Sequence, residues 1–361
     1  MTTSRVAVVT EFHKPLEIWS VPVPAPEPGS LVIRVDAATL CGTDAHRWEG
    51  GRAAVKPPFT PGHETCGTIV EMRGEVRDIL DVPLKIGDRI ISSYPHCGHC
   101  YFCRITRQTS FCPHGISYGA SHPSRLIGGC SEYHYFPPGA SFVKVPEEVS
   151  SPLAASAACA LRTVMHGFEL LGPTENHESL LVQGAGPLGL YTVAVAKARG
   201  LANVMVIGAP QARLDVAKRW GADHVLDLDE ATDPRERIEW AQRLTDGRGP
   251  DIVFQCANTP ALLEAMQIAR LGGRIISIGN SQGAPLNIPQ ELFFRGLRIS
   301  SVRMAEARHF YEAIQFIAKQ REKFDFDLLL TGRYSLEETG EALKAMAEFR
   351  EVKPVIFPHK A

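Results

Sequence analysis

Short apolar runs separated by turn residues fill the first 150 positions of the chain. The runs at 31–35 and 89–92 are rich in Val and Ile and are broken by Pro and Gly, which is typical of β-strands. A strand-like run at 6–9 opens the chain, and the proline-rich residues 22–28 are typical of an extended surface loop. The tail, 350–357, also has the pattern of a strand, which we expect to return to this β-rich first domain.

The pattern changes near residue 150, where an alanine-rich helical segment begins. Ser151 is expected to cap it with Pro152 as the first helical residue, and Gly172 and Pro173 end the segment 153–171. Apolar strands and helices then alternate to about residue 300. The elements expected there are strands at 180–183, 204–207, 251–254 and 274–278, with a helix at 188–199 closed by Gly200. This alternation predicts a parallel sheet covered by helices on both faces.

Composition is that of a soluble globular protein. The chain has 361 residues, 44% hydrophobic and 22% charged, which suggests two domains of ordinary size. A net charge of −2 without basic tracts argues against nucleic acid or an anionic membrane as a partner. No apolar run approaches the ~18 residues of a membrane span, and no signal-peptide core fits before residue 6. The nine cysteines give no even disulfide framework, so we expect a cytoplasmic protein.

Four cysteines fall within sixteen residues in the pattern C-x2-C-x2-C-x8-C, at Cys97, Cys100, Cys103 and Cys112. Their gaps are too short for easy disulfide pairing, and four thiolates suit tetrahedral zinc. An iron–sulfur cluster is the alternative, because Cys112 is followed by Pro113 as in bacterial ferredoxins, although their final gaps are much shorter. His96 and His99 lie in the same segment and are expected to face solvent.

A glycine turn follows the expected strand at 180–183 and opens the next helix. It runs Gly184-Ala-Gly186-Pro187-Leu188-Gly189. In this context the G-x-G-x-x-G pattern predicts a dinucleotide site, because small residues let the backbone approach a pyrophosphate at the N-terminus of a helix.

The next strand ends at Gly208, where NAD-binding folds usually place an acid that holds the ribose. Without a carboxylate there, a 2′-phosphate is not repelled. Arg213 is placed to pair with that phosphate, to lie over the adenine or to face solvent. The sequence therefore allows NADP and does not exclude NAD.

Three more potential metal ligands are scattered along the chain: Cys41, His63 and Cys159. Thr43, Asp44 and His46 follow Cys41, and Glu64 follows His63 in a proline-rich loop. Thr163 shares the helical face of Cys159 at i+4. Taken alone, Cys159 is as easily a small buried residue and His63–Glu64 a surface pair. The remaining candidates are expected to be packing residues: Cys66, Cys130, Cys256 and His166.

Taken together and in this order, these motifs resemble those of the zinc-dependent medium-chain dehydrogenases/reductases of the alcohol dehydrogenase type, over nearly the whole chain. The resemblance implies an α/β protein with two domains. A GroES-like β-rich catalytic domain would comprise 1–156 and 303–361, with a zinc lobe at about 95–115, and a Rossmann domain with a doubly wound parallel sheet would comprise 157–302. It also implies a cofactor set of two zinc ions per chain and NAD or NADP.

The resemblance assigns roles to individual residues. Cys41, His63 and Cys159 would hold catalytic zinc, and Cys97, Cys100, Cys103 and Cys112 structural zinc. Thr43 and His46 would relay a proton, with Glu64 and Asp44 near the catalytic zinc. The expected coenzyme contacts are Thr163 at the nicotinamide, Lys353 at the pyrophosphate, and the turn residues Gly184, Gly186, Pro187, Leu188 and Gly189.

The implied function is reversible hydride transfer between NAD(P) and a small-molecule alcohol, preferentially a secondary one, in a homodimer or homotetramer. Three-ligand zinc with an open position lowers the pKa of a bound oxygen, which makes hydride removal from its carbon easier. Two alternatives are a zinc-free enone or quinone reductase of the same superfamily and a non-catalytic nucleotide-binding protein. Trp48, Phe59 and Met304 are guesses for the substrate pocket, and packing is the plainer role for the first two.

Overall fold

The computed structural model describes residues 2–51, 55–257, 260–279 and 286–360. The chain forms two compact units. Unit 1 comprises Met1–Arg162, Ala305–Lys319 and Phe326–Ala361, and unit 2 comprises Thr163–Met304 and Gln320–Asp325. Cys41, His63 and Cys159 therefore all belong to unit 1, and the glycine turn belongs to unit 2. The domain bounds expected from the sequence lie close to these divisions and stay a prediction.

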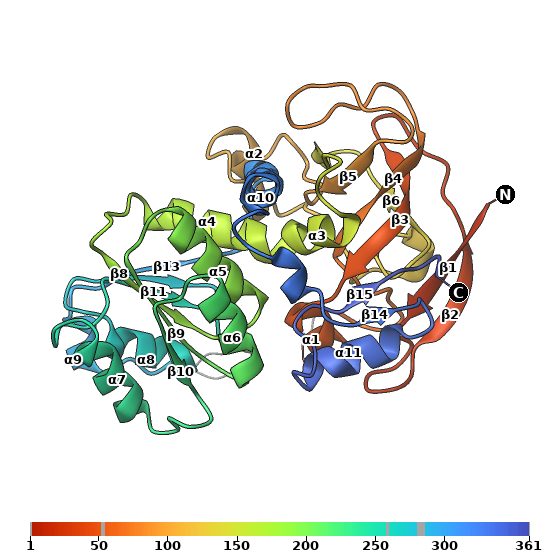
Figure 1. Ribbon diagram of the computed structural model, residues 1–361. Coiled ribbons are helices and arrows are strands. Elements are labelled where there is room, and N and C mark those ends of the chain that lie inside the picture. Colours follow the sequence, from red (N-terminus) through yellow and green to blue (C-terminus); the bar gives the residue numbers. More distant parts are fainter. Residues whose placement is uncertain (1, 52–54, 258–259, 280–285, 361) are drawn as a thin grey trace. The chain divides into compact units, whose positions relative to one another are not determined.

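Unit 1 is built on β-strands, as the short apolar runs in the first 150 positions predict (Figure 1). Its strands are β1 Thr3–Val8, β2 Glu17–Pro22, β3 Leu31–Thr39, β4 Glu64–Met72, β5 Arg89–Ser92, β6 Tyr133–Phe136, β7 Phe142–Lys144, β14 Arg333–Tyr334 and β15 Val355–Ile356. β1 and β2 form a hairpin, and the others form a seven-stranded sheet in the order β14-β15-β3-β4-β5-β7 with β6 also paired to β3. The expected C-terminal strand is present as β15, which is only two residues long and runs antiparallel to β3.

Unit 1 also contains helices. They are α1 Gly42–Trp48, α2 Tyr101–Arg104, α3 Ser151–Ser156, α10 Ala307–Gln320 and α11 Thr339–Ala347. Short 3-10 turns lie at Thr109–Phe111, Pro123–Arg125 and Phe326–Leu329. The buried positions of β3, β4 and β5 pack against Ala342 and Leu343 of α11 in one apolar cluster. This cluster supports the ends of β3 and β4, where the candidate ligands lie.

The alanine-rich segment is helical, but a π-helical turn separates its two α-helices. α3 is followed by a π-helical turn, Ala157–Leu161, and then by α4 Arg162–Leu171. The cap is Ser150, whose side chain accepts from Leu153 N, so the expectation that Ser151 is the cap was wrong by one residue. Pro152 still fits the first turn, because its missing N–H has no intrahelical partner at that position.

Unit 2 has a six-stranded parallel sheet in the order β10-β9-β8-β11-β12-β13. Its strands are β8 Ser179–Gln183, β9 Asn203–Gly208, β10 His224–Asp227, β11 Ile252–Gln255, β12 Arg274–Ser277 and β13 Arg298–Ser301. Counted along the chain, this order is that of a doubly wound fold, with the reversal between β8 and β11. Ligands bind such folds at the carboxyl ends of the strands beside this reversal.

Helices cover both faces of this sheet (Figure 1). They are α5 Pro187–Ala198, α6 Gln211–Arg219, α7 Pro234–Arg243, α8 Pro260–Ile268 and α9 Gln290–Phe293. α5 and α6 pack on β8, β9 and β10, while α7 and α8 share a core with Leu181, Met205 and Val253. No helix in the described part of the chain combines the length and the apolar character needed to cross a membrane.

His134 is a fully buried histidine in the core of unit 1. It lies on β6, and its ring stacks on Phe136 with 4.3 Å between centroids. Neither ring nitrogen has a hydrogen-bond partner among the described residues. Burial lowers the pKa of His134 to about 3, so the ring is neutral in the folded protein at every ordinary pH.

We expect His134 to make the protein acid-sensitive. In the unfolded chain its pKa returns to about 6.5, so the unfolded state gains a proton below that pH while the folded state does not. The contribution of His134 to the free energy of unfolding is therefore fully present above pH ~6.5 and is smaller by about 2 kcal/mol at pH 5. Urea unfolding of His134→Leu should lack this part of the decline. His177→Gln, which removes an exposed histidine, should keep the full decline. An equal fall of the free energy of unfolding with pH in wild type and His134→Leu would contradict the account.

Candidate functional site

Cys41 is fixed by the first turn of α1, which begins directly after β3. Its Sγ accepts from Thr43 N at 3.3 Å, and the Asp44 carboxylate accepts from Cys41 N at 3.2 Å. This is a capping box with cysteine as the cap. The arrangement holds the thiol sulfur at the end of the sheet.

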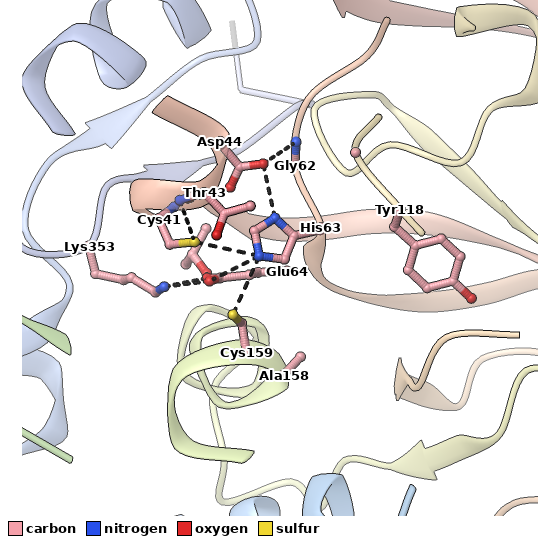
Figure 2. Close-up of polar contacts among 12 residues, drawn as sticks. Cys41, Thr43, Asp44, Gly62, His63, Glu64, Tyr118, Ala158, Cys159 and Lys353 are labelled. Atoms are coloured by element: carbon pink, nitrogen blue, oxygen red, sulfur yellow. Dashed lines mark hydrogen bonds and ion pairs between the residues drawn. The ribbon is translucent and has the colours of Figure 1, made fainter. Parts of the chain in front are cut away.

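His63 precedes β4, and its ring is oriented by Asp44. Asp44 Oδ1 lies 3.0 Å from His63 Nδ1 and also accepts from Gly62 N at 3.2 Å (Figure 2). Burial disfavours the charged form of Asp44, yet the His63 ring, Arg47 and the Cys41 amide hold its pKa below its ordinary value. A carboxylate that accepts a hydrogen bond from Nδ1–H favours the tautomer whose Nε2 is available to a metal.

Cys159 completes a three-residue group. His63 Nε2 lies 3.5 Å from Cys41 Sγ and 3.4 Å from Cys159 Sγ (Figure 2). Cys159 lies on the π-helical turn, a feature common at functional sites and one that alters the expected i+4 relation to Thr163. The structure thus brings Cys41, His63 and Cys159 together from three distant segments.

The donor geometry of this group fits zinc. Tetrahedral bonds of about 2.3 Å to sulfur and about 2.0–2.1 Å to nitrogen place the donors roughly 3.5 Å apart. The sulfur–nitrogen distances of 3.4 and 3.5 Å match that value. A Glu64 oxygen also lies within 4.8 Å of the other donors, so four side chains surround one position.

Glu64 is held by two other residues. Lys353 Nζ donates to its carboxylate at 2.6 Å, and Thr39 Oγ1 donates to Oε2. Lys353 and Glu64 are both fully buried. Burial opposes the ammonium charge, but Glu64 outweighs it and raises the pKa of Lys353 above its ordinary value. The predicted contact of Lys353 with a pyrophosphate stays a prediction; its ammonium donates to Glu64.

Thr43 and His46 lie on α1, one turn apart. Thr43 is half-buried and lies beside Cys41 (Figure 2). The His46 side chain is 41% exposed and lies 3.5 Å from Glu49 Oε2. An inner hydroxyl and an outer imidazole on one short helix have the arrangement that a proton path to solvent requires.

The four clustered cysteines form a second group of donors. Four of their Sγ–Sγ distances are 3.5 Å (Cys100–Cys103), 3.6 Å (Cys97–Cys112), 3.9 Å (Cys100–Cys112) and 4.0 Å (Cys97–Cys103). All four atoms lie within 4.8 Å of one another. These values suit tetrahedral bonds of about 2.3 Å to one ion, which separate sulfurs by roughly 3.8 Å. A multi-iron cluster binds its thiolates to different irons and spreads them wider, so the geometry favours zinc.

The surroundings of this second group agree with metal binding. The His99 and Cys100 amides lower the pKa of Cys97 to about 6, which favours the thiolate that a metal requires. His99 is exposed, with Nδ1 2.8 Å from Cys97 O, whereas His96 is half-buried, so the solvent-facing expectation holds for His99 only.

Glu306 anchors the cysteine segment and was missed by the sequence analysis. Its carboxylate accepts from the amides and hydroxyls of Thr109 and Ser110, at 2.8, 2.5, 3.1 and 2.6 Å. Burial opposes its charge, but these four donors keep the pKa of Glu306 below its ordinary value. Because both oxygens of Glu306 accept hydrogen bonds, the carboxylate fixes the turn that leads into Cys112.

The glycine turn in unit 2 is shaped for close backbone approach. Gly184 has a φ of 101°, and Gly186 caps α5, whose first residues are Pro187 and Leu188. A Cβ on Gly189 would lie 1.8 Å from Gly184 O, so only glycine fits there. The N-terminus of α5 has no side-chain cap and leaves its amides available to an anion.

The missing acid at Gly208 has a steric reason. A Cβ there would lie 2.6 Å from the Ala185 side chain, because the end of β9 packs directly on the glycine turn. The register partner of Gly208 on β10 is Asp227, which supplies a carboxylate on the neighbouring strand. Arg213 is buried, which removes the solvent-facing alternative for it.

The structure places the remaining candidates in varied surroundings. Phe59 is fully buried, and Trp48 packs on the core of unit 1. Met304 O lies 3.0 Å from His166 Nδ1, and Met304 has a φ of 57°. Cys66 and Cys130 are fully buried as expected, whereas Cys256 is only partly buried. Thr163 is buried at the start of unit 2.

Comparison with known proteins decides the family. Residues 27–147 match the model of the alcohol dehydrogenase GroES-like domain, and residues 187–319 match that of zinc-binding dehydrogenases. A relative from Pseudomonas putida, 5-exo-hydroxycamphor dehydrogenase, is 30% identical over 99% of both chains. This chain belongs to the zinc-binding dehydrogenases of the alcohol dehydrogenase type.

Other relatives of this dehydrogenase agree. L-threonine 3-dehydrogenase from Thermococcus kodakarensis is 31% identical over 95% of both chains. An alcohol dehydrogenase structure from Thermotoga maritima has a TM-score of 0.91 at 28% identity and covers 99% of this chain and 100% of its own. A candidate zinc-binding dehydrogenase from Sinorhizobium meliloti, solved with NADP, has a TM-score of 0.86 at 25% identity, covering 99% and 100%.

These matches confirm the fold class expected from the sequence. Unit 1 contains the GroES-like domain, and unit 2 is the Rossmann-type parallel sheet. Zinc and a nicotinamide coenzyme are the cofactors that the family and its structural neighbours support for this dehydrogenase.

Proposed function

We propose that this dehydrogenase is a zinc-dependent alcohol dehydrogenase that transfers hydride reversibly between a secondary alcohol and NAD or NADP. The observation that carries the proposal is the convergence of Cys41 Sγ, His63 Nε2 and Cys159 Sγ at 3.4–3.5 Å. Three such donors bind zinc and leave a fourth position for an oxygen. Relatives named for a hydroxycamphor and for position 3 of threonine support a hydroxyl on a secondary carbon.

Cys41, His63 and Cys159 would hold the catalytic ion, and Cys97, Cys100, Cys103 and Cys112 a second, structural one. Zinc at the first group would supply Lewis-acid chemistry, polarising a carbonyl and lowering the pKa of a hydroxyl. Asp44 fixes the His63 ring through Nδ1, and Lys353 and Thr39 hold Glu64. Two thiolates balance a divalent charge, so the ion is not held as an isolated cation in the protein interior.

The proton of the substrate hydroxyl would pass to Thr43 Oγ1 and then toward the ring of His46. Thr43 is half-buried beside Cys41, and His46 reaches solvent from the same helix. An imidazole suits the outer position because its charge changes near neutral pH. The nicotinamide, which receives the hydride, would lie near Thr163.

The coenzyme would bind the glycine turn with its pyrophosphate at the N-terminus of α5. The small residues Gly184, Gly186 and Gly189 let the backbone come close to the pyrophosphate. The lack of room for a Cβ at Gly189 supports this role. Asp227, the register partner of Gly208, is placed to take over the role of the missing acid, and Arg213 to meet the adenosine end. Parallel assays with both coenzymes decide the preference.

The two rival functions fit less well. A zinc-free reductase does not need Cys41, His63 and Cys159 close together. A nucleotide-binding protein without activity does not need Thr43 and His46. The substrate partner is a small alcohol or carbonyl compound. We also propose a homodimer or homotetramer, because Phe293 and Phe294 are each 74% exposed and β13 is an exposed edge strand whose Ile299 is 42% exposed.

The function is tested with a panel of secondary, cyclic and aromatic alcohols and both coenzymes, followed at 340 nm. We expect turnover with secondary alcohols, loss of turnover when a chelator removes zinc, and recovery when zinc is restored. Metal analysis should give two zinc ions per chain and no iron–sulfur absorption. Full turnover by metal-depleted protein would overturn the proposal.

A further inference from the structure

Arg162 is a buried cation that the proposed mechanism does not use. Its residue surface is 3% exposed, its Nε donates to Ala158 O at 3.1 Å, and its guanidinium carbon lies 5.2 Å from the Phe310 ring centroid and 5.8 Å from that of Tyr94. Nη1 is buried without a hydrogen-bond partner among the described residues. In that same part of the chain, no carboxylate forms an ion pair with it. Arginine is seldom fully buried without a partner, so its charge calls for an explanation.

Arg162 lies next to the candidate catalytic group. Ala158, which accepts from Arg162, directly precedes Cys159 on the π-helical turn, and Figure 2 shows both residues on that turn. Tyr94, beneath the guanidinium, is in ring contact with Tyr118 at 5.0 Å. The charge of Arg162 is therefore held one turn from a proposed zinc ligand, in an interior where charges are poorly screened.

The other charges around this group cancel. Glu64 pairs with Lys353 at 2.6 Å, and Asp44 has Arg47 at 3.9 Å. The two cysteine thiolates balance one divalent ion. Glu306 lies one turn before Phe310 and keeps its charge, but its oxygens accept from Thr109 and Ser110, and no ion pair joins it to Arg162 in the described part of the chain. Arg162 therefore adds one positive charge beside the metal-loaded site that no ion pair among the described residues compensates.

We infer that Arg162 makes the catalytic site of unit 1 selective for anionic ligands, so that a small carboxylate binds there more tightly than a neutral compound of the same shape. Arg162 acts through its charge and is a specificity-determining residue that need not touch the ligand, since its Nη1 is buried. The inference rests on the proposed function in one respect: Cys41, His63 and Cys159 must hold a divalent ion.

The test compares isobutyrate with isobutyramide, which match in shape and differ in charge. Dissociation constants are measured by calorimetry on the full-length zinc-loaded protein, and the visible spectrum of cobalt-substituted protein reports whether each ligand reaches the site. The variants are Arg162→Met, Arg162→Gln and Arg162→Lys. Arg333→Met is the matched control, because Arg333 also lies over a ring, that of Phe357 at 4.3 Å, but is exposed.

We expect wild type to prefer isobutyrate, and Arg162→Met and Arg162→Gln to weaken isobutyrate about tenfold while isobutyramide changes less than twofold. Arg162→Lys should restore binding to within about threefold, and Arg333→Met should change neither ligand. Equal weakening of both ligands would reveal a packing role and overturn the inference. A wild type that does not prefer isobutyrate would also overturn the inference, and this outcome does not depend on the folding of any variant.

The two levels of the argument fail differently. If cobalt spectra show no thiolate-bound ion at Cys41 and Cys159, the proposed function fails and this inference with it. If that ion is present and isobutyrate perturbs its spectrum equally in wild type and Arg162→Met, only the inference about Arg162 fails.

Discussion

Cys41→Ser is expected to lower kcat/KM for a secondary alcohol by about 10³-fold or more. Loss of one of three zinc donors removes several kcal/mol of transition-state charge stabilisation, and each 1.36 kcal/mol is a factor of ten in rate. Because Cys41 also caps α1, serine is chosen, as it caps helices well. The measurement is steady-state turnover at 340 nm on protein whose zinc content is determined in the same preparation.

The control for this substitution is Cys66→Ala. Cys66 is also a buried cysteine of unit 1, on β4, but it belongs to neither group of metal donors. We expect it to keep near-normal turnover and both zinc ions, whereas Cys41→Ser keeps the structural ion and loses the catalytic one. Unchanged activity in Cys41→Ser would defeat the assignment of Cys41, His63 and Cys159.

Lys353→Met is expected to destabilise the protein by about 3–5 kcal/mol, because it leaves Glu64 buried and charged without its partner. The two side chains are fully buried and 2.6 Å apart. Glu64→Gln should also destabilise, since it strands the ammonium of Lys353. The measurement is the free energy of unfolding in urea for both single variants and the double variant.

The double variant separates pairing from packing. Lys353→Met with Glu64→Gln carries no unpaired charge, so it should be more stable than the sum of the single losses by about 1–3 kcal/mol. Arg350→Met, which breaks the exposed pair between Arg350 and Glu341, should have no measurable effect. Strictly additive losses in the double variant would show that the Lys353–Glu64 contact does not contribute as a pair.

Local patterns in the sequence predicted several of the regular elements. The apolar runs at 89–92 and 180–183 became β5 and β8, since a short buried strand is encoded by its own residues. The glycine turn was also predictable, because Gly189 meets Gly184 O within six residues of chain. The two-residue strand β14 had no such signal and depends on pairing with β15, which in turn pairs with β3.

Contacts between distant residues were beyond sequence reasoning. Lys353 and Glu64 are 289 positions apart, and Glu306 and Thr109 are 197 apart, so no spacing rule joins them. The π-helical turn that carries Cys159 is likewise absent from the helical pattern, which has no marker for one extra residue in a turn. The donor types of the metal groups, and Asp44 and Glu64 beside them, were predicted from the sequence, whereas the contacts of Lys353 with Glu64 and of Glu306 with Thr109 were not.

The most direct test of the account is anomalous diffraction at the zinc edge from crystals of the purified protein. The account predicts two peaks per chain. One should lie about 2.3 Å from the sulfurs of Cys41 and Cys159 and about 2.0–2.1 Å from His63 Nε2, and the other within bonding distance of Cys97, Cys100, Cys103 and Cys112. A single peak at the four cysteines, with none between Cys41, His63 and Cys159, would contradict it.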